Sequence, residues 1–205
     1  MNSLSGLIID MRIKEKRRGG ERITVYGDIL FNGKNITETR PDERVKMGIV
    51  LCRERHPIFP ESSVLENLKI AGYLKKRTEV VESIKYVFNL FPALTKLKTR
   101  KGGFLSGGEQ QMLAIGMALI VRPKLLLLDE PLLGLSPMMQ QVVVDAVAQL
   151  KENTGITVVI SEQFARPVLP MIDKGYVVEN GMLTLSGTGR ELMDNPEIKS
   201  AYFGI

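Results

Sequence analysis

The four residues Ser106, Gly107, Gly108 and Glu109 have types and a spacing that could bind an anion. A serine followed three residues later by a glutamate is the pattern of a capping box, which predicts that a helix begins at Ser106. Glycine is a poor residue for the first turn of a helix unless another group must approach the backbone closely. Because a helix N-terminus with bare amides suits phosphate, this stretch is either an ordinary helix start or a phosphate-binding one.

Two carboxylates follow after the predicted helix. Leu125–Leu128 is an apolar run that predicts a buried strand, and Asp129 and Glu130 come at its end. Ligands of open α/β sheets bind at the carboxyl ends of strands. There Asp129 would hold Mg²⁺, directly or through water, and Glu130 would orient and deprotonate an attacking water. Many α/β enzymes end a strand in an acid, so it is the order of the two pieces that points to nucleotide phosphates.

The surrounding sequence alternates strand patterns with helix patterns, which predicts an α/β fold with a mainly parallel sheet. We expect strands at residues 25–31, 48–52, 124–129 and 156–161, and a hairpin at 175–185 that turns at Asn180-Gly181. Between Glu61 and Leu105 helical spacing replaces the strand patterns. We therefore expect an α/β core made of residues 1–60 and 106–205, with a helical subdomain, residues 61–105, inserted into it.

These motifs carry a family resemblance. LSGGEQ followed by LLLLDEP resembles the signature and Walker B motifs of the ATP-binding-cassette (ABC) transporter ATPases. The resemblance implies a P-loop NTPase-like nucleotide-binding domain, ATP and Mg²⁺ as cofactors, and ATP hydrolysis. It implies that Ser106 to Glu109 contact ATP and that Asp129 and Glu130 act as described above. It places Glu54 where family members use a Gln or Glu to sense Mg²⁺ and the transmembrane partner, and Gln163 where most members carry a switch histidine.

Gln163 and the C-terminal segment 175–205 together resemble one branch, the second ATP-binding subunit of branched-chain amino acid importers. That branch implies a second ATPase subunit and transmembrane permease subunits as partners, and a peripheral location on the cytoplasmic face of the cell membrane. We expect a short permease helix to dock near residues 54–73. The apolar residues that could line this docking site are Ile58, Phe59, Val64 and Leu65. Met117, Leu132 and the segment 52–57 depart from the family pattern, and the single histidine, His56, is assigned no role.

The phosphate loop of the family, G-x-x-x-x-G-K-S/T, has no match in the sequence. The nearest stretch, from Gly27, has five residues rather than four between its glycines and offers Asn35 where a hydroxyl is needed. The resemblance implies that Met1 lies near the end of the helix that such a loop begins. We therefore expect an N-terminally truncated domain that binds ATP very weakly and does not hydrolyse it alone.

Three functions fit these observations. In the first, the chain is a truncated form of a complete transport ATPase. In the second, the short chain is a degenerate partner that supplies only the signature motif to the ATP site of another subunit. In the third, it is a soluble ABC protein acting on nucleic acid or ribosomes, which the short insert at residues 61–105 disfavours. Cassette subunits do not choose the cargo, so the branched-chain amino acid substrate rests on resemblance alone.

Composition limits these choices. The chain is 44% hydrophobic with a net charge of +5 and a pI near 9.3. Its single cysteine, Cys52, excludes an internal disulfide and fits a reducing compartment, the cytosol. The longest apolar run, Met112–Val121, is about half of the ~20 residues that span a bilayer. The basic cluster at residues 12–22 has no interleaved aromatic residue, so we interpret it as a solvated loop and expect no nucleic-acid partner.

Overall fold

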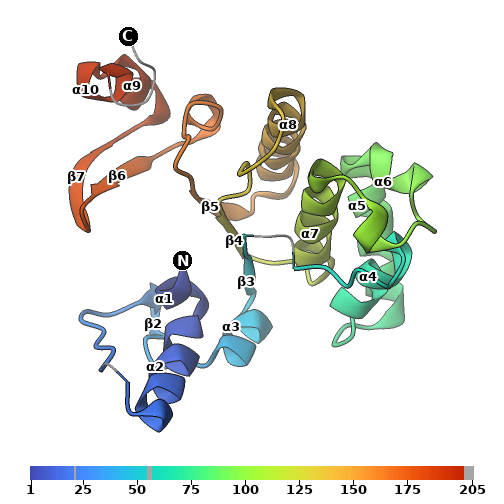
Figure 1. Cartoon of the computed structure of the whole chain (residues 1–205), viewed down its shortest axis with the longest axis horizontal. Coiled ribbons are helices and arrows are strands. Elements are labelled where there is room, and N and C mark those ends of the chain that lie inside the picture. The colour runs from blue at the N-terminus through green and yellow to red at the C-terminus, as the bar shows by residue number, and fades with distance from the viewer. Residues whose placement is uncertain (21, 55–56, 201–205) are drawn as a thin grey trace.

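Three parallel strands form the centre of the molecule, in a computed structural model that describes residues 1–20, 22–54 and 57–200. They are β3 (Ile49–Cys52), β4 (Leu125–Asp129) and β5 (Thr157–Ser161), in the spatial order β3-β4-β5 (Figure 1). Ile49 pairs with Leu125, and Leu125 with Thr157. The strands predicted at residues 48–52, 124–129 and 156–161 are confirmed to within one residue.

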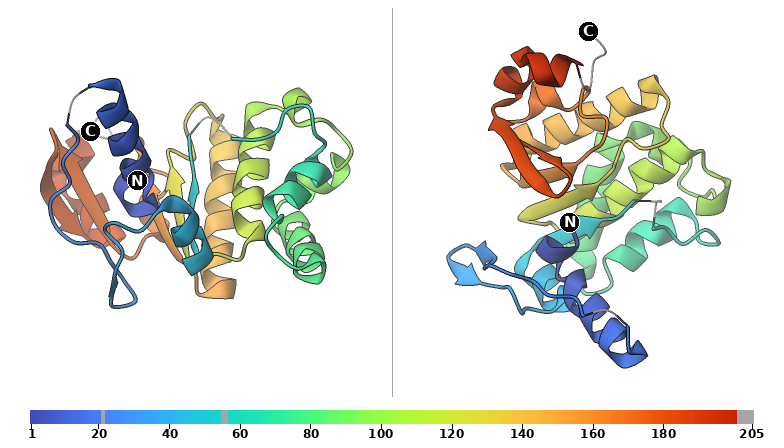
Figure 2. Two further views of the ribbon diagram at one scale, coloured as in Figure 1. Left: turned by 90° about the horizontal axis from the view of Figure 1, so that it is seen from below. Right: turned by 60° about the vertical axis from the view of Figure 1, so that its left-hand side comes forward.

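Apolar side chains cover both faces of this sheet, as expected for a parallel sheet. On one face, Val50, Cys52, Leu126 and Leu128 join a large core with helices α7 (Gly107–Ile120) and α8 (Pro137–Thr154). On the other face, Ile49 and Leu127 pack with Ile36 and with residues near α1 (Asn2–Ser5). Figure 2 shows α7 and α8 lying next to each other on one side of the sheet. Alternate strand residues therefore belong to different clusters, which is the period of two that a strand imposes.

Residues 61–105 form helices, as predicted. They contain α4 (Val64–Ala71), α5 (Arg77–Leu90), α6 (Pro92–Lys96) and the short 3₁₀ helix η1 (Gly102–Phe104). Val80, Ile84 and Val87 are buried on one side of α5, as their spacing predicts. They belong to the same core as the sheet residues and α7. The helical segment thus packs continuously with the sheet, and its separation as a subdomain remains a prediction.

The N-terminal third differs from expectation in two places. The strand predicted at residues 25–31 is reduced to β1 (Leu30–Phe31), paired with β2 (Lys34–Asn35), because no strand of the described residues lies beside residues 25–28 and Tyr26 is 89% exposed. The prediction of a loop at residues 12–22 is wrong for residues 12–18, which belong to helix α2 (Leu7–Arg18). Its Lys, Arg and Glu residues are good helix formers, and Gly19 ends the helix in the left-handed conformation, with φ 68°.

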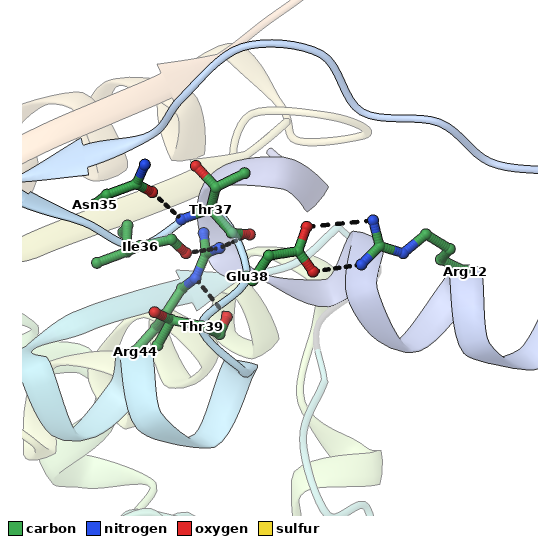
Figure 3. A network of polar contacts seen from close by, with 7 residues as sticks. All are labelled: Arg12, Asn35, Ile36, Thr37, Glu38, Thr39 and Arg44. Atoms are coloured by element: carbon green, nitrogen blue, oxygen red, sulfur yellow. Dashed lines mark hydrogen bonds and ion pairs between the residues drawn. The ribbon is translucent and has the colours of Figure 1, made fainter.

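A buried arginine joins the N-terminal segments to helix α3 (Pro41–Met47) (Figure 3). Arg44 is fully buried, and its guanidinium donates to five backbone carbonyl oxygens at 2.5 to 3.0 Å. These oxygens belong to Ser3, Leu4, Ile36, Thr37 and Thr39. Burial lowers the pKa of Arg44, partly offset by the charge of Glu38, which forms an ion pair with Arg12. Arg44 therefore fixes α3, and the strand β3 that follows it, to the start of the chain.

The C-terminal region packs around a smaller cluster. Strands β6 (Gly175–Glu179) and β7 (Met182–Gly187) form the predicted hairpin, turning at Asn180 and Gly181, whose φ angles are 50° and 79°. The hairpin packs with η2 (Leu169–Met171), α9 (Gly189–Asp194) and α10 (Pro196–Ile198). Among the described residues it is not paired with the three-stranded sheet.

Candidate functional site

The predicted metal and catalytic residues lie at one edge of the sheet. Because the strands are parallel and in register, with Cys52 beside Leu128 and Asp129 beside Ser161, their carboxyl ends share that edge. Glu54 follows the end of β3 by two residues, Asp129 ends β4, and Gln163 follows the end of β5 by two residues. Glu54 and Gln163 are exposed, and Asp129 is half-buried.

Asp129 is oriented by the neighbouring strand. Its Oδ1 accepts a hydrogen bond from the Ser161 hydroxyl at 2.5 Å. On the other side, burial raises the pKa of the Cys52 thiol to about 12, and the charge of Asp129 contributes to the rise. The thiol therefore stays protonated at neutral pH.

Glu130 begins a tight turn with a strained backbone. Its φ is 47°, a region that residues other than glycine adopt infrequently and at a cost of about 1–3 kcal/mol. Its amide donates to the carbonyl oxygen of Ser161 at 2.9 Å, which extends the β4–β5 ladder by one residue. The positive φ turns the chain sharply at the end of β4, so that Leu132, two residues later, is buried in the core. The apolar residue at this position, a departure from the family pattern, therefore has a packing role.

The sequence did not reveal the role of Glu162. Its carboxylate accepts a hydrogen bond from the Leu132 amide at 2.7 Å and so ties the turn after β4 to the end of β5. Burial raises the pKa of Glu162, and so does the charge of Glu130, whereas the amides of Leu132, Gln163 and Phe164 lower it. An acid directly after a strand end was a visible signal, but its partner lies 30 residues away in the sequence.

The helix start at Ser106 has the predicted capping box. The Ser106 amide donates to Glu109 Oε2 at 2.7 Å, and the Glu109 amide donates to Ser106 Oγ at 3.4 Å. By helix geometry the amides of Gly107 and Gly108 have no partner within α7. A Cβ on Gly107 would meet nothing within 4 Å, whereas a Cβ on Gly108 would lie 2.6 Å from Met139 Cε. Packing against Met139 thus explains Gly108, and the open backbone that suits an anion is at Gly107.

A second helix begins beside this one. Ser136 caps α8, its Oγ accepting a hydrogen bond from the Met139 amide at 3.4 Å, and Met139 is the residue that packs on Gly108. Ser106, Gly107 and Ser136 are exposed. Among the described residues no hydrogen bond or ion pair joins this pair of helix starts to Asp129 or Glu130. The site therefore has two separate parts, the carboxyl edge of the sheet and the paired starts of α7 and α8.

The residues expected to line a docking site differ in exposure. Phe59 is 48% exposed and Ile58 and Leu65 are half-buried, but Val64 is fully buried in the core, so Val64 is wrong as a lining residue. Close by, a cavity of about 250 Å³ lies between α3, β3 and α7. Its walls include Val50, Leu51, Cys52, Pro57, Ala71, Ala114, Met117 and Val121. Met117, another departure from the family, lines this cavity, and His56 lies outside the described residues.

Among residues 1–20, 22–54 and 57–200, no three His, Cys, Asp or Glu side chains are grouped so as to hold a metal ion by themselves. Within the same residues, no helix combines the length and the apolar character needed to cross a bilayer.

Comparison with known proteins agrees with this geometry. The model of a family described as ABC transporter matches residues 20–133. A Pseudomonas aeruginosa protein, the high-affinity branched-chain amino acid transport ATP-binding protein BraG, is 38% identical over 178 residues, which cover 87% of this chain and 76% of the relative. The probable branched-chain amino acid transport ATP-binding protein LivF of Archaeoglobus fulgidus is 35% identical over 179 residues, with the same coverage of 87% and 76%.

Solved structures give the same result. The ADP conformation of MJ1267, an ATP-binding cassette of an ABC transporter, superposes with a TM-score of 0.74 at 30% identity and covers 88% of this chain and 78% of that chain. A nucleotide-free ATP-binding cassette gives a TM-score of 0.76 at 27% identity, over 98% of this chain and 81% of that chain. Together with the signature and Walker B segments at α7 and β4, these similarities show that the chain belongs to the ABC transporter family and has the fold of its ATPase domains.

Proposed function

We propose that this chain is an ATP-binding subunit of an importer for branched-chain amino acids, which couples ATP binding and hydrolysis to transport. The observation that carries the proposal is the common edge formed by Glu54, Asp129–Glu130 and Gln163 at the ends of three adjacent parallel strands. The cargo is taken from the names of the BraG and LivF relatives. The same relatives favour transport over a soluble protein acting on nucleic acid or ribosomes.

The donor set at the edge suits ATP with Mg²⁺. Mg²⁺ prefers oxygen ligands and is commonly held by one or two carboxylates, with phosphates and water completing its shell. The carboxylates of Asp129 and Glu54, which end or follow neighbouring strands, match this donor set. Asp129, fixed by Ser161, would hold the ion, with Glu54 as a second carboxylate. The metal would neutralise charge on the phosphate oxygens.

The remaining roles follow from the positions of the side chains. Glu130 would orient a water molecule and accept its proton, since the strained turn holds its backbone at the end of β4. Gln163 would orient the reacting groups from the end of β5. The amides of Gly107 and Gly108, with Ser106, would bind phosphate, and the Glu109 carboxylate would hold the helix start in shape. We place the core at residues 1–60 and 106–205 and the helical subdomain at residues 61–105.

The separation of α7 and α8 from the carboxylates favours a site shared by two subunits. The exposed starts of α7 and α8 would face the phosphates bound by a second ATPase subunit. This observation also supports a second candidate function, in which the chain supplies only its signature motif to that subunit. A permease subunit would dock at Phe59 and the 250 Å³ cavity, which would place the chain on the inner face of the cell membrane.

The test measures ATP-dependent pairing with an intact partner ATPase by analytical ultracentrifugation. Ser106→Arg should abolish pairing because the larger cation fills the helix start, whereas Glu130→Gln should leave it intact. Ser63→Arg is the matched control, because Ser63 caps α4 with the same box, formed with Glu66, outside the site. If Ser63→Arg and Ser106→Arg reduced ATP-dependent pairing equally, the effect would be one of helix stability and the proposed contact would be refuted.

Hydrolysis gives an independent test. The 205-residue chain has no G-x-x-x-x-G-K-S/T segment, so we expect no measurable ATP turnover by the chain alone and no effect of Glu130→Gln on that background. Turnover by the purified chain that Glu130→Gln removes would show that the phosphates are held by another element, and the proposed inactivity would be wrong.

A further inference from the structure

A cavity of about 510 Å³ opens at the amino edge of the sheet, the edge opposite Asp129. It lies between helix α5, the carboxyl ends of α7 and α8, and the residues that lead into β4 and β5 (Figure 1). All of its walls come from residues 82–156, and none of them belongs to the carboxyl edge, the helix starts or the 250 Å³ cavity. Its volume falls within the range of roughly 300–1,000 Å³ that is typical of small-molecule sites.

The inner walls of this cavity are apolar. Leu119 and Leu150 are buried, and Tyr86, Pro123 and Ile156 are half-buried. Each of the five comes from a different helix or connecting segment, so apolar surface is present on several sides of the cavity. A hydrocarbon or aromatic group that enters the cavity is therefore removed from water on several sides, which favours its binding.

The charged wall residues are exposed and leave one cation unpaired. They are Glu82, Arg122 and Lys124. Arg122 Nη2 pairs with Glu82 Oε2 at 2.6 Å, and Arg122 Nε donates to the Ser83 hydroxyl at 3.1 Å, so the charges of Arg122 and Glu82 offset each other. The Lys124 ammonium forms no ion pair within the described residues. The mouth of the cavity therefore has a net positive charge at Lys124.

Arg122 joins two walls of the cavity at the end of α7. Its φ of 54° lies in the left-handed region, where glycine is usual after a helix and an arginine is strained. Its amide donates to the Leu119 carbonyl at 2.9 Å, while its guanidinium reaches α5, so the walls are connected before any ligand binds. Its charge also offsets the partial negative charge of the helix end. Because Arg122 faces both that partial charge and Glu82, Lys124 is the cation available to a ligand.

We propose that this cavity binds a small molecule with an apolar body and a single anionic group, a carboxylate or a sulfonate. The body would lie against Leu119, Leu150 and Ile156, and the anion would pair with Lys124 at the mouth. A neutral molecule of the same shape would bind more weakly because it leaves Lys124 unpaired. The site would bind this ligand whether or not the chain takes part in transport.

The first experiment compares two fluorescent dyes that differ in one charged group. 1-Anilinonaphthalene-8-sulfonate has an apolar body and one sulfonate, and N-phenyl-1-naphthylamine is the same body without the sulfonate. Titration of the full chain should show saturable binding of the anionic dye, and the neutral dye should bind several-fold more weakly at low salt only, because added salt screens the ion pair. Absence of saturable binding of the anionic dye would overturn the proposal. Equal affinity of the two dyes at low salt would overturn the predicted anionic group.

The second experiment tests the charge with Lys124→Gln and a matched control, Lys85→Gln. Lys85 is an exposed lysine of α5 outside the cavity walls. Lys124→Gln should weaken binding of the anionic dye several-fold and leave binding of the neutral dye unchanged, whereas Lys85→Gln should change neither. Equal weakening of the anionic dye by both variants would show a general attraction to a chain of net charge +5 and would refute the role of Lys124.

The third experiment narrows the cavity with a bulky side chain. Thr154 is a wall residue at the end of α8, and Asn153 is its neighbour outside the walls; both are exposed. Thr154→Trp should weaken binding of the anionic dye by about tenfold or more, whereas Asn153→Trp should leave it unchanged. An unchanged Tm shows that each variant is folded. Wild-type affinity in folded Thr154→Trp would refute the site.

Methyl NMR of the wild-type chain locates the dye directly. Binding of the anionic dye should shift the methyl signals of Leu119, Leu150 and Ile156. The methyl signals of Leu133, which is 45% exposed in the turn after β4, should not shift. Saturable binding without shifts at the three wall residues would place the dye elsewhere and contradict the proposal.

Discussion

Arg44 allows the most direct test of how the N-terminal segments hold the sheet. We consider Arg44→Met, which keeps an unbranched apolar stem and removes the guanidinium. Five carbonyl oxygens then lose a charge-assisted donor, one of them, that of Ile36, in a fully buried position and four in partly buried ones. Methionine offers no donor, so only water could replace these bonds.

The expected loss follows from these five bonds. A buried acceptor left without a partner costs about 1–3 kcal/mol, and a partly buried one can recover most of its hydrogen bonding from water. Removing the cation also relieves its own desolvation, which burial imposes and which lowers the pKa of Arg44. We expect a net loss of about 3–5 kcal/mol, as for one partner of a buried polar network. For a chain of this size that corresponds to a fall in Tm of about 6–20 °C.

The assay is thermal unfolding followed by circular dichroism, with hydrogen exchange to locate the change. Arg44→Lys should fall between wild type and Arg44→Met, because three ammonium donors serve five carbonyls in two chain segments. Arg40→Met is the control, since its side chain is 70% exposed and it should change the stability by no more than about 1 kcal/mol. An unchanged Tm for Arg44→Met, together with unchanged amide protection in α1, would refute this account of the N-terminal packing.

Three further predictions concern the site. Gly108→Ala should destabilise the chain by about 1–3 kcal/mol because the new methyl group meets Met139, whereas Gly107→Ala should be neutral in stability; thermal unfolding with the opposite ranking would contradict this. The Cys52 thiol, with a pKa near 12, should resist iodoacetamide at pH 8 until urea unfolds the chain, and rapid labelling of the native chain would count against it. Burial raises the pKa of Glu162, so its protonated form stabilises the fold at low pH and this contribution is lost as pH rises through the folded pKa. The stability of Glu162→Gln relative to wild type, measured by urea titration, should therefore be greater at pH 8 than at pH 4. Parallel pH profiles of the two proteins would exclude this.

Local chemistry was sufficient to predict much of the fold. The apolar runs at residues 124–129 and 156–161 form strands whose side chains pack on both faces of the sheet, fully buried in the middle of β4 and half-buried in β5. Asn180-Gly181 turns the hairpin because both residues tolerate positive φ. The capping box at Ser106 depends on two side chains three residues apart, so the sequence contains all the information it needs. For Asp129 the end of an apolar run indicated the carboxyl end of a strand, whereas the roles expected for Glu54 and Gln163 came from the family resemblance.

Predictions that required a distant partner were less successful. The segment before Leu30 has strand-forming residues, and the Ile29 carbonyl still accepts a hydrogen bond from the Ile36 amide, but no strand of the described residues pairs with residues 25–28. The sequence alone did not show that Val64 is buried, because its burial depends on the packing of α4 against α7. The role of Glu162 depends on the amide of Leu132, which a sharp turn brings to it. In each case the deciding contact lies far away in the sequence.

The two glycines of the signature helix show why a motif does not by itself assign a role to each residue. Gly108 has no side chain because Met139 of α8 occupies that space, and Gly107 has open space around it. The contact at Gly108 connects α7 to α8, and α8 follows the Glu130 turn after a short segment in which Leu132 and Leu135 are buried. The close packing at Gly108 therefore joins the start of α7 to α8, the helix that follows the Glu130 turn.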